Sequence, residues 1–375
     1  MNSSKILYIF GSGRREKIRT NNYASSEFFY GYFYMKSKFN SIDSIEMLPN
    51  DEDINGSRKI LNFVDKVVRK LTNLPFFTHL MLSKKNFRKI KEAEIIISTN
   101  DRLAISALPM IMLSRFRASR KKLLVIVMGL FSKKRDTKVV YYFQKIFLII
   151  ILKQIDNLIF LGMGEYKLAI KMYPKFKEKF KFIPFGINLD FWQPSKNYTE
   201  ESNDYILFVG NDGNRDIDKV IEIANSLKNI NVKIITSHKI SADRINKNTE
   251  VIYGNWHSSA LTDESLKSYY ENSILTFIPL KETFQPSGQS VTLQSMSLGI
   301  PVVITKTNGF WDSDKFKHLE NIIFMKDNNL DSWSNNLRSL VQDKKLLNKI
   351  SRNSVNTVHK NYDQKDFFTE MEKLI

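Results

Sequence analysis

The sequence predicts an α/β protein built from two Rossmann-like domains with a helical tail. Short, almost continuous apolar runs alternate with amphipathic segments along the whole chain, which is typical of parallel strands covered by helices on both faces. The 375 residues are enough for two domains of ordinary size. A stretch with two prolines and a polar end, residues 184–203, separates two such series. We therefore expect residues 1–190 and 191–375 to fold as the two domains.

Hydrophobic periodicity predicts the individual elements. The first half is expected to contain strands at residues 5–10, 44–47, 93–98, 123–128, 157–161 and 180–183, with helices at 25–39 and 58–71. The second half is expected to contain strands at 205–209, 232–236, 249–253, 273–278, 301–305 and 322–325, helices at 216–227, 262–271, 289–298 and 330–342, and tail helices at 344–362 and 364–375. In the helix at 58–71, Ile60, Leu61, Val64, Val67 and Val68 share one apolar face.

The composition excludes several classes of protein. Hydrophobic residues make up 42% of the chain and charged residues 26%, which indicates a globular chain and not a disordered or collagen-like one. The absence of cysteine excludes a disulfide scaffold, a thiolate nucleophile, a cysteine-bound zinc and an iron–sulfur site. The five histidines are scattered, so a histidine-rich metal site is not expected.

Charge is distributed unevenly along the chain. Residues 1–190 carry 35 basic and 16 acidic residues, an excess of 19 positive charges, whereas residues 191–375 carry 22 and 23. This asymmetry favours an anionic partner for the first half, such as a membrane surface, a nucleic acid or a phosphorylated substrate. A codon bias toward lysine would raise the lysine content of both halves, so it does not explain the difference.

Basic residues accompany apolar segments in the first half, at residues 115–122 and 133–152. The pattern is typical of an interfacial helix on anionic lipid and also of a buried crossover helix with a solvated start; the charge excess favours the membrane. The apolar run at 139–152 is interrupted by Lys145 and is shorter than the about 20 residues that a transmembrane helix needs. With no predicted signal peptide or span, we expect a cytoplasmic protein held peripherally at the inner face of the cytoplasmic membrane.

Two polar loops that follow strands of the second half have the chemistry of a diphosphate site. In the first, Gly210 and Gly213 allow a close backbone approach, and Arg215 can donate paired hydrogen bonds to phosphate oxygens. In the second, Ser287 and Gly288 directly precede a helix whose N-terminal N–H groups and dipole favour an anion. Serine capping and plain turns would give the same patterns. Both loops, however, follow strands of one predicted sheet, at the edge where α/β folds bind ligands.

The first half offers candidates of its own. Gly11 and Gly13 follow the first strand, and Arg14 and Arg15 come directly after them. The two arginines are either ligands for an acceptor phosphate or a solvated pair. Asp101 follows the third predicted strand. It is a candidate general base or acceptor ligand, although the role of N-cap for the next helix explains the same position.

Three segments of the second half resemble a known family. LQSMSLGIPVVITKTNG, residues 293–309, resembles the L-E-A-M-A-x-G-x-P-V-V-x-T-x-x-G run of retaining nucleotide-sugar glycosyltransferases of the GT-B fold, family 4. KFIPFGINLDFWQP, residues 181–194, is similar to that family's interdomain crossover, and YILFVGNDGNRD, residues 205–216, to its second-domain strand and glycine loop. The resemblance covers residues 181–375. It implies a GT-B fold with a donor cleft between two Rossmann-like domains, the acceptor bound by the N-terminal domain and the sugar nucleotide by the C-terminal domain.

The loops and the resemblance together give a set of candidate donor-binding residues: Gly210, Asn211, Gly213, Arg215, Lys281, Ser287, Gly288, Gln289, Ser290 and Gln294. The family's paired glutamates are not intact, because Gln294 stands at the second position, a ribose ligand in the family, and Pro286 at the first. Glu282 lies near that first position and is, with Asp101, a candidate catalytic residue. Met128 stands where the family has a histidine at the end of a strand.

We therefore expect a retaining glycosyltransferase of the hexosyltransferase type. It would move a sugar from a nucleotide sugar to a lipid-linked or polysaccharide acceptor in surface glycan biosynthesis. The Ser287–Ser290 amides, the helix dipole and Arg215 or Lys281 would stabilise the diphosphate leaving group. The resemblance implies no bound metal or other cofactor, and no nucleic-acid partner is expected. A GT-B sugar-nucleotide epimerase is the alternative enzyme. A basic nucleic-acid-binding protein is a further alternative, although no recognition motif accompanies the charge.

Overall fold

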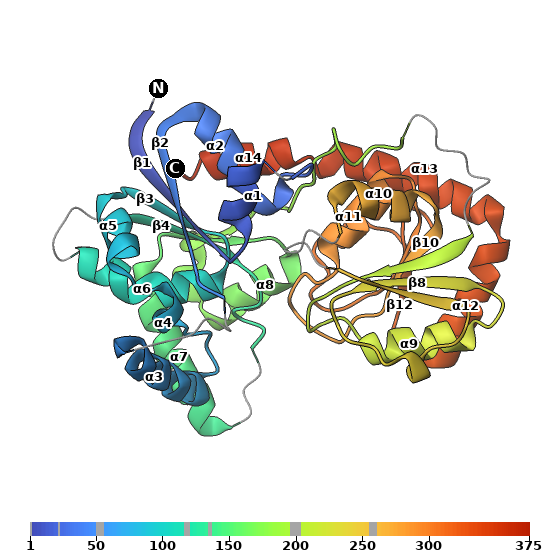
Figure 1. Cartoon of the computed structure of the whole chain (residues 1–375), viewed down its shortest axis with the longest axis horizontal. Helices are drawn as coiled ribbons and strands as arrows, with labels where there is room; N and C mark the ends of the chain where they lie inside the picture. Colours follow the sequence, from blue (N-terminus) through green and yellow to red (C-terminus); the bar gives the residue numbers. More distant parts are fainter. Residues whose placement is uncertain are drawn as a thin grey trace. The chain divides into compact units, whose positions relative to one another are not determined.

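Both halves of the chain fold around a parallel six-stranded sheet in the computed structural model (Figure 1). The structure describes residues 2–21, 23–49, 56–115, 121–133, 137–195, 204–254 and 261–375. The chain divides into two compact units, of which unit 1 contains Met1–Asn22, Phe28–Ile183 and Phe368–Ile375. Unit 2 contains Tyr23–Glu27 and Pro184–Phe367. A five-residue segment from early in the sequence thus belongs to the second unit, and the end of the chain belongs to the first.

The sheet of unit 1 has the order β2-β1-β3-β4-β5-β6, and all of its pairs are parallel. Its strands are β1 (Asn2–Phe10), β2 (Phe39–Glu46), β3 (Ile95–Ser98), β4 (Lys122–Val127), β5 (Asn157–Phe160) and β6 (Phe180–Phe182). Its helices are α1 (Arg14–Thr20), α2 (Tyr32–Lys38), α3 (Ser57–Thr72), α4 (Thr78–Met81), α5 (Lys84–Glu92), α6 (Asp101–Arg115), α7 (Lys138–Gln154) and α8 (Met163–Met172).

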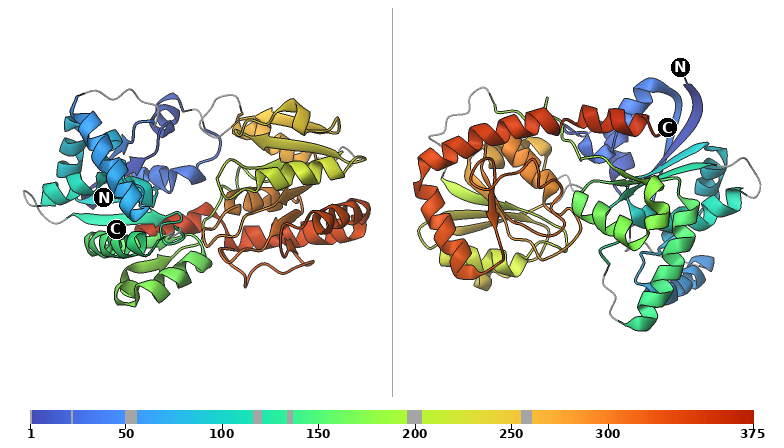
Figure 2. Two further views of the ribbon diagram at one scale, coloured as in Figure 1. Left: turned by 90° about the horizontal axis from the view of Figure 1, so that it is seen from below. Right: turned by 180° about the vertical axis from the view of Figure 1, so that it is seen from behind.

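The sheet of unit 2 has the order β12-β11-β10-β7-β8-β9 and is also parallel throughout. Its strands are β7 (Tyr205–Val209), β8 (Asn231–Thr236), β9 (Thr249–Tyr253), β10 (Ser273–Ile278), β11 (Val302–Thr305) and β12 (Ile323–Met325). The helices that follow are α9 (Ile217–Ser226), α10 (Asp263–Glu271), α11 (Gln289–Ser297), α12 (Leu330–Gln342), α13 (Lys344–Asn361) and α14 (Gln364–Glu372). Figure 2 shows helices on both faces of each sheet.

The central strands are buried along their whole length, for example β3 and β7, because helices cover both faces of their sheets. This arrangement explains why the apolar runs in the sequence are continuous and do not alternate with polar residues. Each unit has its own cluster of buried apolar side chains. The predicted class, α/β with two Rossmann-like sheets and a helical tail, is confirmed.

One predicted helix of the first half differs from the structure, and another has an unexpected orientation. The helix expected at residues 25–39 is interrupted, because Tyr30 (φ 49°) and Gly31 (φ 81°) have left-handed backbones, and only a short 3-10 turn at Glu27–Phe29 precedes α2. The helix α3 forms where expected, but the apolar face that contains Ile60, Val64 and Val67 is exposed and does not join the core.

Candidate functional site

The site in unit 2 lies where the order of its strands reverses. From β7 the chain proceeds outward through β8 to β9, and from β10 it proceeds outward in the opposite direction through β11 to β12. The loops that follow β7 and β10 therefore leave neighbouring strands at the carboxyl edge of the sheet. Crevices at such a reversal are the usual ligand sites of open α/β sheets.

Hydrogen bonds join these two loops into one structure. The Lys281 N–H donates to the Asn214 carbonyl at 2.9 Å, and the Asp216 N–H donates to the Pro279 carbonyl at 3.1 Å. The Asn214 side-chain amide donates to the Ser287 hydroxyl at 2.8 Å. The structure thus brings together the two loops that the sequence marked separately.

Arg215 is the buried cation of this edge. Only 5% of the residue is exposed, and its Nη1 atom lies 3.2 Å from the Asp212 carboxylate. A Cβ atom built on Gly210 would lie 2.5 Å from its Nε, and one built on Gly288 would lie 3.5 Å from its Nη1, so the side chain lies close to both glycines. Within the described structure neither Nε nor Nη1 makes a hydrogen bond, and Nη1 is held only by its ion pair with Asp212. A buried guanidinium whose Nε makes no hydrogen bond, and whose Nη1 makes only an ion pair, can still donate to an anionic ligand.

The N-terminus of α11 offers further donors. Gly288 is its N-cap with φ +82°, a left-handed conformation that suits glycine, and no side chain caps the helix. Ser287 does not serve as the cap, since its hydroxyl accepts from Asn214. Gly288 thus contributes no side-chain cap to the first turn of α11, and the helix dipole places partial positive charge there.

The remaining loop residues have varied surroundings. Asn211 ties neighbouring strand ends together, since its side chain accepts from the Ser237 N–H and donates to the Gly254 carbonyl. No atom lies within 4 Å of a Cβ built on Gly213, so nothing in the described structure requires glycine there. Lys281 and Glu282 are both exposed, and the Glu282 carboxylate accepts from the Asn308 N–H at 3.0 Å.

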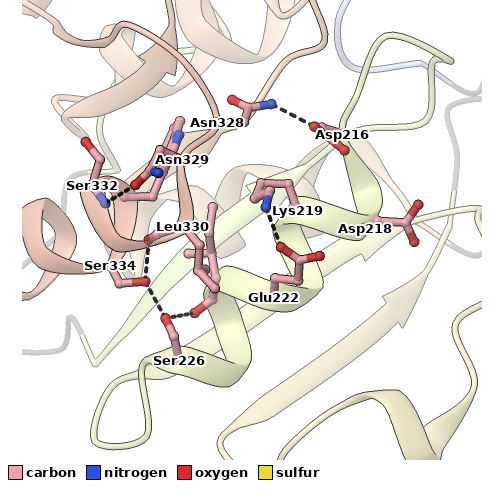
Figure 3. Close-up of polar contacts among 12 residues, drawn as sticks. Asp216, Asp218, Lys219, Glu222, Ser226, Asn328, Asn329, Leu330, Ser332 and Ser334 are labelled. Carbon is pink, nitrogen blue, oxygen red and sulfur yellow. Dashed lines mark hydrogen bonds and ion pairs between the residues drawn. The ribbon is translucent and has the colours of Figure 1, made fainter.

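Asp216 ends the first loop and fixes it to the rest of the sheet edge. Its carboxylate accepts from the Asn328 side-chain amide at 2.8 Å (Figure 3). Asn328 also donates to the Leu280 carbonyl at 3.0 Å and accepts from the Thr305 hydroxyl at 2.6 Å. Asn328, which follows β12, thus hydrogen-bonds to both the loop after β7 and the loop after β10 and stabilises their conformations.

Gln294 lies on α11 and is 3% exposed. Its amide nitrogen donates to the Glu27 carboxylate at 3.0 Å, and its carbonyl oxygen lies 3.5 Å from the Tyr270 hydroxyl. Glu27 belongs to the early segment of the chain that packs in unit 2.

Glu27 is a residue of this region that sequence reasoning missed. It is fully buried and also accepts hydrogen bonds from the Trp192 indole at 2.8 Å and from the Ser25 hydroxyl. Burial raises the pKa of its carboxyl, while these hydrogen bonds act in the opposite direction. Its place within a predicted helix gave no signal of this role. The sequence separation of 267 residues from Gln294 means that only the fold reveals the contact.

Unit 1 has its own strand reversal, between β1 and β3. The loop after β1 contains Gly11 and Gly13 and leads into α1, where Arg14 donates from Nε to the Phe28 carbonyl at 3.2 Å. The Arg15 N–H donates to the Glu46 carboxylate at 2.9 Å. The candidate acceptor residues therefore lie at the reversal, with the Arg14 side chain turned toward the protein.

Asp101 is the first residue of α6 but does not cap it, because the Asn100 side chain accepts from the Leu103 N–H. The Asp101 carboxylate instead accepts from the Met128 N–H at 2.8 Å, which places the carboxylate beside the loop after β4. Asp101 is 4% exposed, and this burial raises the pKa of its carboxyl.

Glu165 on α8 is a second buried carboxyl in the same part of unit 1. Its two oxygens each accept a backbone N–H, from Gly129 and Phe131, at 3.0 Å. Burial, and then the charge of Asp101, raise the pKa of Glu165 to about 8. Sequence reasoning missed this residue, because one glutamate in an amphipathic helix carries no distinguishing signal.

Within the part of the chain that the structure describes, no group of three or more carboxyl, histidine or cysteine side chains could hold a metal ion. The same residues contain no helix with the length and apolarity that crossing a bilayer requires.

Solved structures with this fold align over nearly the whole chain. Anabaena Alr3699/HepE in complex with UDP and glucose is 12% identical, with a TM-score of 0.65, over 99% of this chain and 98% of that one. Sucrose-phosphate synthase from Thermosynechococcus elongatus is 13% identical, with a TM-score of 0.66 and the same two coverages. A glycosyltransferase from Rickettsia africae is 12% identical, with a TM-score of 0.65, over 100% of this chain and 98% of that one. No protein-family model and no curated protein matches the sequence. The chain has the GT-B fold of these structures, as the resemblance implied.

Proposed function

We propose that this protein is a glycosyltransferase that uses a nucleotide-sugar donor. The observation that carries the proposal is Arg215, a buried guanidinium at the strand reversal of unit 2 whose Nε and Nη1 make no hydrogen bond in the described structure and whose ion-pair partner there is the Asp212 carboxylate. A nucleoside diphosphate supplies the missing acceptors, and the uncapped N-terminus of α11 supplies further N–H donors to the same group. The similar fold of proteins crystallised with UDP or UDP-glucose supports a uridine nucleotide as the first donor to test.

The proposed donor chemistry is electrostatic. When the bond between the sugar and the diphosphate breaks, negative charge grows on the leaving diphosphate. Arg215, the exposed Lys281 and the N–H groups of Gln289 and Ser290 are proposed to stabilise that charge more strongly in the transition state than in the bound donor. Gln294 is proposed to hydrogen-bond the ribose, with its amide oriented by Glu27.

The acceptor is proposed to bind at the strand reversal of unit 1. Gly11 and Gly13 give backbone access there, and Arg14 and Arg15 supply positive charge for an acceptor phosphate. Asp101 is proposed to take a proton from the acceptor hydroxyl, since burial raises the pKa of its carboxyl and so makes the carboxylate a stronger base.

Three further features of the reaction are proposed. Glu282, on the loop after β10, is the candidate to contact the reacting sugar. The charge excess of residues 1–190 supports a lipid-linked or polysaccharide acceptor and a peripheral location at the inner face of an anionic cytoplasmic membrane. The resemblance to family 4 supports a retaining transfer without a metal.

Isothermal calorimetry with UDP tests the donor site directly. We expect binding to the wild-type protein and a loss of affinity in Arg215→Ala. The matched control is Arg244→Ala, which removes another arginine of unit 2 that is half exposed and paired with Asp218. Absence of UDP binding, or equal affinity in Arg215→Ala and wild type, contradicts the proposal. Conversion of UDP-glucose to an epimer without any acceptor, followed by NMR, would identify an epimerase instead.

A further inference from the structure

Helix α3 is oriented with its apolar side outward. Ile60, Phe63, Val64, Val67 and Leu71 are 69%, 68%, 48%, 42% and 40% exposed. Their spacing of three, four, seven and eleven residues from Ile60 places them on one continuous stripe of the helix. The buried residues of the same helix are polar, namely Asp65 and Thr72. A surface helix of a globular protein normally has the reverse arrangement, so this stripe requires an explanation.

Polar contacts fix α3 in this orientation. The Asp65 carboxylate accepts from the His79 backbone N–H at 3.0 Å and contacts the His79 ring at 2.7 Å. The Thr72 hydroxyl accepts from the Leu74 N–H at 3.2 Å. Arg69 donates to the Phe76 carbonyl and lies over the ring of Phe77. Rotating the helix to bury its apolar stripe would break these contacts, so the outward stripe is a stable part of the fold.

Helix α7, the neighbour of α3, also exposes apolar side chains. It packs against α3, as Figures 1 and 2 show. Its exposed apolar and aromatic side chains are Val139, Tyr141, Tyr142, Phe143, Ile146 and Ile150. Among the described residues, 11 of the 16 large exposed apolar or aromatic side chains lie on these two helices. A concentration of this kind on one part of a surface indicates an interaction site.

The charge of the two helices selects the partner. Together they contain eight basic residues and one acidic residue, and the acidic one is Asp65, which is buried against His79. Two copies of this face would bring like charges together, which disfavours a dimer. An anionic lipid surface complements both features, because it attracts lysines and accepts apolar side chains. Tyrosines such as Tyr141 and Tyr142 are enriched at the level of lipid headgroups.

The basic cluster at residues 115–122 contributes less than its sequence indicates. Lys121 is 2% exposed and donates to the carbonyls of Lys91 and Ala93 at 2.6 Å. Arg115 donates to the carbonyls of Gln154 and Lys121. Residues 116–120 lie outside the described part of the chain.

We propose that α3 and α7 together form a membrane-docking face that lies in the interfacial layer of an anionic bilayer. The apolar stripe enters the boundary between headgroups and acyl chains, while the lysines beside it contact anionic headgroups. This inference rests on the proposed membrane location and identifies its surface. It adds α3 to the membrane surface that the sequence indicates. Periodicity alone would place the apolar stripe of α3 in a core. It does not depend on the donor site, which lies in unit 2.

Vesicle flotation of the full-length protein tests this face. The probes are phosphatidylcholine vesicles with and without phosphatidylglycerol. We expect flotation only with the anionic vesicles. Phe63→Ser and Tyr142→Ser should each weaken it by about tenfold, from the scale of burying one aromatic side chain. The matched control is Leu113→Ser on α6, a 48% exposed apolar residue of the same unit, which should bind as wild type does.

A charge variant tests the electrostatic half of the proposal. Replacing the exposed Lys59, Lys66 and Lys70 with Gln should weaken binding roughly 100-fold at low salt, at about 1 kcal/mol for each charge. Replacing Lys344, Lys345 and Lys360, three exposed lysines on α13, should leave it unchanged. Wild-type binding should also fall as added salt screens the lysines.

Fluorescence gives a readout of insertion that loss of folding cannot imitate. The four tryptophans of the chain all lie at residue 192 or beyond. Brominated phospholipid should therefore quench added emission from Phe63→Trp in bound protein, and not from Leu113→Trp.

The proposal would be overturned if the protein floated equally with neutral vesicles, or did not float with anionic ones. It would also be overturned if Leu113→Ser weakened vesicle binding as much as Phe63→Ser does, or if brominated lipid did not quench the emission of Phe63→Trp. Sedimentation that shows a dimer dissolved by Phe63→Ser would assign the face to a second copy and overturn it as well. UDP calorimetry on each variant keeps the two proposals separate, because a failed docking face leaves donor affinity intact.

Discussion

The two strand-reversal edges share a topology but treat their polar groups in opposite ways. In unit 2, Arg215 is buried, its Nε and Nη1 make no hydrogen bond in the described structure, and the N-cap of α11 is a glycine without a side-chain cap. In unit 1, Asp101 and Glu165 are buried with their carboxylates engaged by backbone N–H groups, and Asn100 caps α6. The edge of unit 2 is therefore the one where we propose that an anion binds.

The difference shows that a parallel sheet provides the place for a site but not its chemistry. A buried polar group without a partner costs free energy, and proteins retain such groups mainly where a ligand completes them. The carboxyls of unit 1 already accept backbone N–H groups and so fix the loop after β4, and burial raises the pKa of both. We expect four measurable effects at these two edges, on stability or on UDP affinity.

The largest expected effect concerns Glu165. Its pKa of about 8 in the folded protein exceeds the usual 4.5, so between these two values the native state holds a proton that the unfolded state has lost. Stability should therefore fall as the pH rises from about 4.5 to about 8, by up to roughly 4 kcal/mol. Urea unfolding across this range should show the decline in wild type and a flatter profile in Glu165→Gln. Glu178→Gln, at an exposed glutamate of the same unit, is the control. An NMR titration of Glu165 near 4.5 would show that the unit 1 edge does not protonate its carboxyl.

Arg215→Ala should have the next largest effect, on the edge of unit 2. Removing a charge-assisted pair of hydrogen bonds should weaken UDP binding by about 1.5–3 kcal/mol, measured by calorimetry. Arg244→Ala should bind as wild type does. Unchanged affinity in a folded Arg215→Ala protein would remove the main contrast between the two edges.

A pair of glycine variants sharpens the same contrast. In Gly210→Ala the new methyl group would lie 2.5 Å from the Arg215 Nε and must displace the guanidinium, whereas Gly213→Ala has open space. We expect Gly210→Ala to lose about 1–2 kcal/mol of UDP affinity, comparable to one charged hydrogen bond. Gly213→Ala should lose almost none. Equal losses would mean that the backbone of the loop, and not the position of Arg215, controls binding.

Gln294→Ala should have an effect of similar size that depends on the nucleoside. If Gln294 contacts the ribose, UDP should bind about 1–2 kcal/mol more weakly, the scale of a lost hydrogen bond to a buried partner, and inorganic pyrophosphate should be almost unaffected. Gln193→Ala, at an exposed glutamine of unit 2, is the control. Equal losses for UDP and pyrophosphate would indicate that Gln294 only supports α11 through Glu27.

Much of the fold was accessible from the sequence because it depends on local patterns. The apolar runs that become β3 and β7 are buried on both faces, so their residues show no polar alternation, and this identified parallel sheets. Gly288 and the stretch before α11 predicted a helix start, and Arg215 followed a strand end by simple spacing. Strand ends in a parallel sheet meet at one edge, which is why two separate loops could be assigned to one site.

Long-range contacts were not accessible in this way. The position of Glu27 in unit 2, the engagement of Asp101 by the Met128 N–H and the pairing of Asp65 with His79 each join residues that local periodicity treats as unrelated. The apolar face of α3 shows the same limit, because periodicity identifies which side chains share a face but not whether that face meets a core or solvent.

The sequence by itself therefore determined two parallel α/β units, the two glycine-containing loops of the second unit, and the presence of Arg215 in the first of these loops. Each of these features follows from propensity, spacing and hydrophobic pattern within a short window. Only the tertiary structure decided which polar groups are left without partners and which apolar faces are left uncovered. The physical reason is that both depend on what packs against a residue from elsewhere in the chain. Arg215 is a candidate ligand for a diphosphate because, within the described structure, its Nε makes no hydrogen bond and its Nη1 only an ion pair with Asp212, and that is a property of the packed molecule.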